Sequence, residues 1–275
     1  MRTVAALITC HNRKAQTITC LGRLFQQSLP SETVLGVYLV DDGSTDGTAH
    51  EVGATYPAVN IIPADGTLYW SEGTRLAWRY ASKADPDAYL LLNDDTALYP
   101  DALASLLAIA KPFSARPCIV VGSCRDAVTG HHTYGGELVR TRHPGQTIPL
   151  VPDDAETNRC DTFNGNCVLV TRAAFRLLGS LRSFKHAIAD TDYGLRATRM
   201  GIPLLLAPGY LATCQRNPIE GSWRNRTLPR TQRMRLLIGR KGLPPWDWWR
   251  FLWQHAGLRA LLYWPIPYVR VLVGL

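Results

Sequence analysis

The first 110 residues alternate between short apolar runs and longer amphipathic segments, and no other feature of the sequence constrains the fold as strongly. A short apolar run is typical of a buried strand, and an amphipathic segment between two such runs is typical of a connecting helix. Regular alternation of this kind indicates a parallel α/β sheet with helices on its faces. We predict strands at Val4–Ile8, Leu35–Val40, Val59–Ile62 and Tyr89–Leu92, and helices near residues 14–27, 46–55, 71–83 and 100–110.

Polar clusters follow three of these predicted strands. They are Thr9–Arg13, Asp41–Ser44 and Asn93–Thr96. Ligands of open α/β sheets bind beyond the carboxyl ends of the strands, where parallel strands bring their ends to one edge. We therefore expect the three clusters to line a common ligand site.

The Asp41–Ser44 cluster allows two interpretations. A carboxylate at a strand end can accept hydrogen bonds from a nucleotide base N–H and from a ribose hydroxyl. The same residue types also form tight turns, in which Asp and Ser cap the next helix. The residues alone favour neither interpretation over the other.

The Asn93–Thr96 cluster places two carboxylates, Asp94 and Asp95, at the end of a buried strand with no basic neighbour in the sequence. Such a pair repels itself unless a positive group joins it. A hard divalent cation such as Mg²⁺ or Mn²⁺ takes oxygen ligands and bridges diphosphate oxygens. The alternative role, a cap for the following helix, is weaker because that helix begins about five residues later.

Residues 118–170 lose the helical periodicity and become richer in Gly, Thr, Val and Pro. We predict β-rich structure there, with hairpins around Gly135-Gly136 and Asn164-Gly165. A helix then begins near Asp190 and ends at Gly201. Acidic residues in a first helical turn are ordinary helix-dipole chemistry, but a carboxylate there can also accept a proton as a general base.

The segment after residue 215 carries the basic charge of the chain. From Arg216 to Leu275 eleven Arg and Lys residues stand against Glu220 and Asp247, a local balance of +9, whereas the whole chain has a net charge of +8. Six of the eight Trp residues also lie there. Basic residues with Trp are typical of the headgroup zone of anionic membranes. The alternative is that this segment packs on the preceding domain as additional core.

Two further features bear on the cellular compartment. The apolar run at the N-terminus is too short for a signal core, and the C-terminal apolar stretch is interrupted by Arg259, Pro265, Pro267 and Arg270. Seven cysteines, an odd number without a CxxC pair, argue against a disulfide framework or a zinc site. We predict a cytoplasmic protein that is peripheral on the inner face of the cell membrane.

Five segments together resemble family 2 glycosyltransferases of the GT-A fold, in the order in which that family carries them. The resemblance is greatest to bacterial members that build cell-envelope polysaccharides, rhamnosyltransferase-like ones included. It covers about residues 1–213 and rests on Thr9–Arg13, Val40–Asp46, Leu91–Thr96, Phe163–Asn166 and Asp190–Arg196.

The resemblance implies a fold, a domain division and a reaction. The fold is α/β, with a Rossmann-like, mostly parallel sheet flanked by helices in a catalytic domain of residues 1–215. Residues 216–275, called the C-terminal extension below, follow as a helical segment. The reaction is an inverting transfer of a sugar from a nucleotide-diphosphate sugar to a hydroxyl of a glycan or polyprenyl-linked acceptor, dependent on Mn²⁺ or Mg²⁺.

The resemblance also implies roles for individual residues. Asp95 is the principal metal ligand with Asp94 beside it, and Asp190 is the base, with Asp192 as the alternative. The implied nucleotide-binding residues are Thr9, His11, Asn12, Arg13, Asp41, Asp42, Gly73, Arg75 and Asp94. The implied residues on the acceptor side are Asn164, Gly165, Asn166 and Arg196.

The chain departs from the family pattern at two places. Ala189 stands where the family has the first acid of a Glu-Asp pair, and Thr213-Cys214-Gln215 stands where many relatives have a histidine. Either metal affinity is lower, or Cys214 or Gln215 substitutes for that histidine as a ligand.

A second hypothesis is a non-catalytic module of the same fold that binds a nucleotide or nucleic acid through the C-terminal extension. Arg and Trp side chains there could contact phosphates and stack on bases. Binding alone does not require Asp95 and Asp190, however. We therefore expect a transferase without a nucleic-acid partner.

Overall fold

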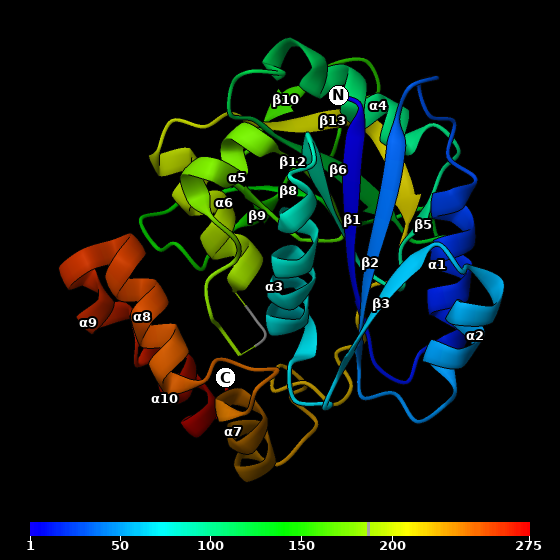
Figure 1. Ribbon diagram of the computed structural model, residues 1–275. Coiled ribbons are helices and arrows are strands. Elements are labelled where there is room, and N and C mark those ends of the chain that lie inside the picture. The colour runs from blue at the N-terminus through cyan, green and yellow to red at the C-terminus, as the bar shows by residue number, and fades with distance from the viewer. Residues whose placement is uncertain (186–187) are drawn as a thin grey trace.

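The computed structural model describes residues 1–185 and 188–275, and its N-terminal half is the predicted parallel unit (Figure 1). The strand β1 pairs in parallel with β2 and β4, and β2 pairs in parallel with β3. Every strand and helix expected over the first 110 residues is present, with small shifts at the ends. These elements are β1 (Thr3–Cys10), α1 (Lys14–Phe25), β2 (Val34–Asp42), α2 (Thr48–Thr55), β3 (Val59–Ala64), α3 (Tyr69–Ala81), β4 (Ala88–Leu92) and α4 (Ala102–Ala110).

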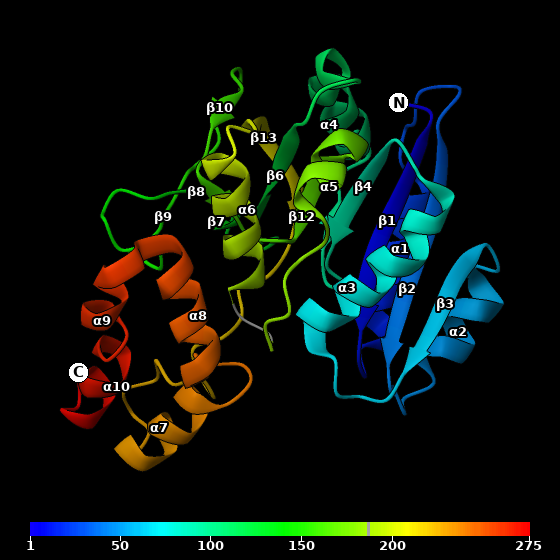
Figure 2. The same ribbon diagram turned by 60° about the vertical axis from the view of Figure 1, so that its left-hand side comes forward.

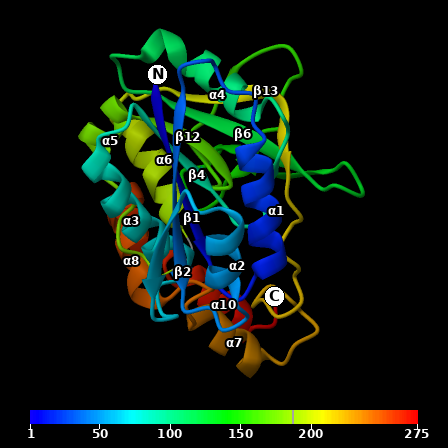
Figure 3. The same cartoon turned by 45° about the vertical axis from the view of Figure 1, so that its right-hand side comes forward.

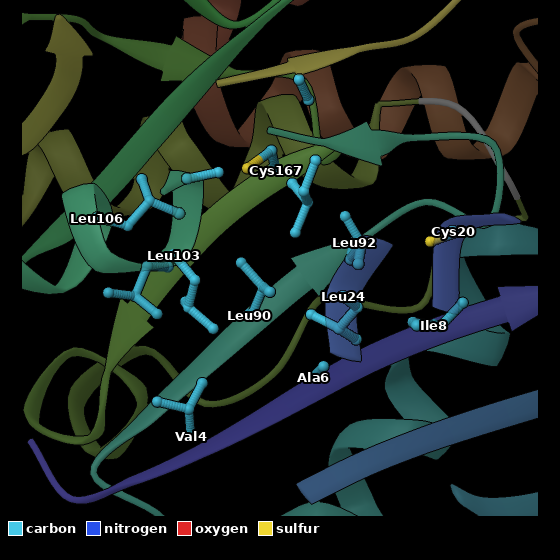
Figure 4. Packing of buried hydrophobic residues seen from close by; sticks show 14 of the residues in the cluster. Val4, Ala6, Ile8, Cys20, Leu24, Leu90, Leu92, Leu103, Leu106 and Cys167 are labelled. Atoms are coloured by element: carbon cyan, nitrogen blue, oxygen red, sulfur yellow. The ribbon is translucent and has the colours of Figure 1, made fainter. Parts of the chain in front are cut away.

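The apolar runs are continuous because both faces of the sheet are covered. Along β1, Val4, Ala6 and Ile8 point into one core, packed under α1, α2 and α4 (Figure 4). Ala5 and Leu7 point into a second core, on the face of α3. Side chains alternate between the two faces of a strand, so a strand buried on both sides is apolar throughout. Figure 3 shows α1 and α2 on one side of the sheet and α3 on the other.

The second half of the chain extends this sheet with mixed pairing. The strand β12 (Cys167–Thr171) lies antiparallel between β4 and β6 (Ile119–Arg125), and β13 (Leu204–Thr213) pairs in parallel with β6. The main path of the larger sheet is β10-β13-β6-β12-β4-β1-β2-β3, with β5 paired to β13 and β7 to β6 beside it, and a smaller sheet has the order β11-β8-β9. The remaining short strands are β5 (Ala97–Leu98), β7 (His132–Tyr134), β8 (Gly136–Leu138), β9 (Ile148–Pro149), β10 (Asn158–Arg159) and β11 (Thr162–Phe163).

The prediction of hairpins at Gly135-Gly136 and Asn164-Gly165 was wrong. Both pairs lie where the chain passes between the larger sheet and the smaller one. A Cβ atom on Gly165 would overlap the ring of Trp70, so this glycine permits a close approach rather than a turn. The antiparallel pair β6–β7 is instead closed by residues 126–131, where the Asp126 carboxylate accepts backbone N–H groups of Val128 and Thr129.

Helices cover the second core and continue into the C-terminal extension (Figure 2). The expected helix near Asp190 is α6, and Gly201 follows it in the left-handed region at φ +72°. Trp248, Phe251 and Leu252 of α8 belong to the same core as α6. The helices are α5 (Arg172–Leu178), α6 (Ala189–Arg199), α7 (Arg230–Ile238), α8 (Pro245–Ala256), α9 (Ala260–Tyr263) and α10 (Ile266–Leu272), with single 3₁₀ turns η1 (Ser82–Ala84), η2 (Lys111–Phe113) and η3 (Gly257–Arg259).

The helix α8 therefore packs on the preceding domain as additional core, which was the alternative interpretation of the C-terminal extension. Within the described ranges, no helix combines the length and the apolar character that a membrane crossing requires.

Candidate functional site

The loops after β1 and β2 are tied to each other at the carboxyl edge of the sheet. His11 Nδ1 lies 2.5 Å from the carbonyl oxygen of Asp42, and the backbone N–H of Asn12 donates to Ser44 Oγ at 2.9 Å. Thr45 N–H donates to the side-chain oxygen of Asn12 at 2.7 Å. Asn12 has φ +51°, a region that Asn tolerates better than most residues. Two of the three predicted polar clusters thus form one surface.

The two carboxylates after β2 have different roles. Asp42 uses both oxygens to accept backbone N–H groups of Gly66, Leu68 and Tyr69, so it fixes the turn into α3. Asp41 accepts the backbone N–H of Ser44 through Oδ1 at 3.0 Å. The Cys10 thiol lies 3.9 Å from the same oxygen.

The second turn of α3 lies against the end of β1. A Cβ atom on Gly73 would overlap the side chain of Thr9, so α3 needs glycine at this point to approach β1. Arg75 follows Gly73 by two positions, and its guanidinium donates to Glu72 Oε2 at 2.5 Å. Arg75 also lines a cavity with Trp78 and Phe175, between α3 and α5.

The carboxylates after β4 are joined by a cation from a distant part of the chain. Arg13 Nη1 lies 3.1 Å from Asp94 Oδ1 and 2.7 Å from Asp95 Oδ2. Arg13 precedes the two Asp residues by more than eighty positions, which is why they have no basic neighbour in the sequence. The Arg13 side chain thus connects the first and third predicted clusters.

The pKa of Asp94 is raised to about 7, chiefly by burial, with Arg13 opposing the shift and Asp95 contributing to it. Asp94 Oδ2 and Asn93 Oδ1 are buried and have no hydrogen-bond partner among the described residues. Leaving such oxygens unpaired is costly, so the pair suits an additional positive group.

The residues present fit a hard divalent cation. Two carboxylates and an unpaired buried oxygen match the oxygen ligands that Mg²⁺ and Mn²⁺ prefer. In the described part of the chain no group of three or more His, Cys, Asp or Glu side chains forms a ready metal cage. Magnesium sites of phosphate-using enzymes likewise take one or two carboxylates and leave the remaining positions to substrate phosphates and water. A cavity of about 240 Å³, lined in part by Gln16, Cys20 and Asp95, opens beside the pair.

Cys214, at the position where many family relatives have histidine, lies at the same place. Its sulfur is 3.5 Å from Asp95 Oδ1 and 3.4 Å from the side-chain nitrogen of Asn166. Burial raises the pKa of this thiol to about 12, and Asp95 adds to the effect. Gln215 is exposed and contributes only its backbone oxygen to Cys214.

The candidate base is linked to the candidate metal motif by two consecutive residues. Asp190 Oδ2 accepts the backbone N–H of Gly165 at 3.1 Å, and the next residue, Asn166, accepts the backbone N–H of Asn93 at 3.3 Å. Gly165 and Asn166 therefore connect the first turn of α6 with the end of β4. This connection brings Asp190 to the sheet edge where Asp94 and Asp95 lie.

Burial raises the pKa of Asp190 to about 6, and the negative charge of Glu137 adds to it. Backbone N–H groups of Thr191 and Gly165 oppose the shift by donating to the carboxylate. Asn164, the residue before Gly165, has its side-chain amide 3.4 Å from Glu137 Oε1. Glu137 could not be singled out from the sequence, because it lies on a three-residue strand without periodicity.

Asp192 and Arg196 are part of a buried ionic cluster. Arg196 Nε donates to Asp192 Oδ2 at 2.9 Å, and its other nitrogens donate to the carbonyl oxygens of Leu178 and Ser180. Asp192 also lies 2.8 Å from His255 Nε2, and its side chain is fully buried. In this arrangement both residues hold α6 in place.

Comparison with known proteins agrees with this geometry. The sequence model described as Glycosyl transferase family 2 matches residues 5–168, more than half of the chain. The chain belongs to glycosyl transferase family 2. The predicted family membership is thereby confirmed.

Solved structures of other glycosyltransferases share the fold of this family 2 member. A mannosyltransferase, PcManGT from Pyrobaculum calidifontis in complex with GDP-Man and Mn²⁺, is similar with a TM-score of 0.58 and 17% identity, over 99% of this chain and 73% of that one. S. aureus TarS 1-349 in complex with UDP-GlcNAc is similar with a TM-score of 0.59 and 13% identity, over 98% and 74%. These likenesses confirm the predicted GT-A fold. No curated protein matches the chain.

Proposed function

We propose that this family 2 glycosyltransferase moves a sugar from a nucleotide-diphosphate sugar to an acceptor hydroxyl with inversion at the sugar. The observation that carries the proposal is the Asp190 carboxylate. Its pKa of about 6 suits a general base at neutral pH, and Gly165 and Asn166 link it to the Asp94–Asp95 pair.

In the proposed reaction, Asp190 accepts the proton of the acceptor hydroxyl while the hydroxyl oxygen attacks the sugar carbon that bears the diphosphate. The N–H groups of Gly165 and Thr191 keep the carboxylate oriented during this step. A divalent cation held by Asp95 and Asp94 would neutralise the charge of the departing diphosphate. The bound GDP-Man and Mn²⁺ of the mannosyltransferase support this assignment of donor and metal.

The proposed donor site combines the three loops at the sheet edge. The Asp41 carboxylate would accept from the base or the ribose, while His11 and Asn12 hold the loop that faces it. Arg13 would contact the diphosphate once the cation shares the carboxylates. Asp42 shapes the site by fixing the turn into α3, and the close contact of Gly73 with Thr9 sets the distance of α3 from β1. Arg75 of α3 is proposed to act near the diphosphate.

The proposal is tested with a panel of UDP-, GDP- and dTDP-sugars that includes UDP-GlcNAc and GDP-mannose. A donor raises the melting temperature through linkage, and with Mn²⁺ we expect a larger rise than with EDTA. The protein should also slowly hydrolyse the donor that stabilises it. Stabilisation without any hydrolysis by the folded enzyme would instead support the non-catalytic binding module.

The pKa of Asp190 predicts a pH dependence. A general base must be ionised, so kcat for donor hydrolysis should be constant above about pH 7 and fall about tenfold per pH unit well below pH 6. A pH–rate profile from pH 4.5 to 8.5, with melting temperatures recorded at each pH, checks this. A profile that stays flat through pH 5 in folded protein would contradict the assignment.

We further propose that the C-terminal extension holds the enzyme on the anionic inner face of the cell membrane, where a polyprenyl-linked glycan is the acceptor. Large apolar side chains stay exposed on consecutive elements of the extension, among them Leu258 of η3, Leu261 and Leu262 of α9 and Leu272 of α10. Arg259 and Arg270 lie among them. Exposed leucines with adjacent arginines suit a helix that lies in the interface plane.

The membrane proposal is tested by point variants, because removing the extension would strip Trp248 and Phe251 from the core. We expect the double variant Leu261→Glu, Leu262→Glu to bind phosphatidylglycerol-containing liposomes at least about tenfold more weakly in co-sedimentation. Leu177→Glu, at an equally exposed leucine of α5, is the matched control and should bind normally. Equal binding of the double variant and the wild type would contradict the proposal.

A further inference from the structure

The C-terminal extension contacts the helix that carries the proposed base through a buried ionic cluster. His255 Nε2 of α8 lies 2.8 Å from Asp192 Oδ1, and Arg196 Nε donates to Asp192 Oδ2 at 2.9 Å. The side chain of His255 is 2% exposed and that of Asp192 is fully buried. Arg182 Nη1, at 3.8 Å, is the other cationic group beside Asp192 within the described residues.

The cluster lies next to the proposed base on the same helix. Asp192 follows Asp190 by two positions, and both are in the first turn of α6. Removing a hydrogen-bond partner from a buried carboxylate leaves one of its oxygens unsatisfied, which is costly, so the carboxylate tends to shift toward another donor. A shift of Asp192 would therefore move the turn that aims Asp190.

The backbone just before α6 is strained. Ile188 has φ +65°, in the left-handed region that a β-branched residue adopts only when its surroundings impose it. The N–H of Asp192 donates to the carbonyl oxygen of Ile188 at 2.8 Å, so the strained residue and the buried carboxylate belong to one turn. Contacts from outside the turn are needed to maintain this conformation.

Those contacts come from α8 on both sides of the turn. Before it, the backbone N–H of Lys185 donates to Asp247 Oδ2 at 2.8 Å, and Arg250 donates to the carbonyl oxygen of Ser183 at 3.1 Å. After it, Arg199 of α6 donates to the carbonyl oxygen of Gln254 at 2.7 Å. The helix α8 thus brackets the turn, and His255 reaches its centre.

We propose that α8 positions the catalytic base, with His255 as the positioning residue that fixes Asp192 and thereby the Asp190 carboxylate. This inference rests on the proposed role of Asp190 as base. It assigns to the C-terminal extension a part in the chemical step in addition to its place in the core.

The test compares three full-length variants, His255→Phe, His255→Gln and Gln254→Ala, with the donor chosen from the panel above. His255→Phe removes the polar contact and should lower kcat for donor hydrolysis about 10–100-fold, since small displacements of a catalytic group cost up to about 10²-fold. The donor dissociation constant should change less than about threefold. His255→Gln, whose amide can reach Asp192, should recover most of kcat, and the neighbouring Gln254→Ala should match the wild type.

Wild-type kcat in folded His255→Phe, with Asp190→Asn inactive, would overturn the inference and leave the proposed function intact. Full activity of Asp190→Asn would instead show that Asp190 is not the base. If His255→Phe does not fold, His255→Asn and His255→Gln form the deciding pair, because the shorter Asn amide cannot reach Asp192. A lower kcat for Asn than for Gln supports the inference, and equal kcat values overturn it.

Discussion

Replacing Asp190 with Asn should lower the rate of sugar transfer by about 10²–10⁴-fold, the usual cost of losing a general base. An amide has nearly the shape of a carboxylic acid but cannot accept the proton of the acceptor hydroxyl. Donor binding should persist, because the donor loops lie on β1, β2 and β4 and not on α6. Initial-rate kinetics with a donor-binding measurement, such as calorimetry, separate the two effects.

The fold should tolerate this change. The pKa of Asp190 is about 6 in the folded protein, above its ordinary value of 3.8. Its titration therefore favours the folded state most below pH 3.8, and this contribution is lost as the pH rises through 6. At pH 7.5 a neutral Asn avoids the burial of a charge, so the melting temperature should be equal to or higher than that of the wild type.

Asp192→Asn is the informative comparison, because Asp192 was the alternative base. Asp192 is fully buried between Arg196 and His255, so its loss should destabilise the protein by about 3–5 kcal/mol, the cost of breaking a buried ion pair. Denaturant unfolding measures this. If Asp192→Asn were stable yet inactive while Asp190→Asn stayed active, the roles of the two carboxylates would be exchanged.

Replacing Asp95 with Ala should lower transfer at least about 10²-fold, because a metal ion at a departing group stabilises the transition state by several kcal/mol. Arg13 would still pair with Asp94, so no buried cation is left alone and the fold should be retained. The extra stabilisation that Mn²⁺ gives to the donor complex should disappear in thermal shift. Chelation of the wild type by EDTA should reproduce both losses.

Asp101→Ala is the matched control for Asp95→Ala. Asp101 is an exposed carboxylate just before α4, and its side chain does not cap that helix. This variant should keep full activity and its response to Mn²⁺. Full activity of Asp95→Ala, or equal wild-type activity with Mn²⁺ and with EDTA, would contradict the assignment of a metal ion to this site.

The sequence predicted most of the N-terminal fold because the relevant signals are local. The run Val4–Ile8 is apolar throughout since both faces of β1 are buried, and the spacing of such runs predicts parallel pairing. Polar residues at successive strand ends predicted a shared edge, and the loops after β1 and β2 do meet there. These features depend only on neighbouring residues and on the general geometry of parallel sheets.

The mixed second half was less predictable. The residue pairs at Gly135 and Gly165 are of the kind that is typical of turns, but the Gly165 backbone lies against the Trp70 ring. A glycine that permits close packing and a glycine that closes a hairpin look the same in one sequence. Only the position of the partner, almost a hundred residues away, distinguishes them.

The sequence by itself determined the order of the main strands and helices through residue 110, without β5 and η1. It also determined the three polar clusters and the acidic first turn of α6. The tertiary structure decided what each acid does: Arg13 joins Asp94 and Asp95, Asp42 fixes the turn into α3, and Asp192 is buried against His255. The physical reason is that periodicity and turn chemistry act between near neighbours. Burial, ion pairing and the resulting pKa shifts depend on groups that only the folded chain brings together.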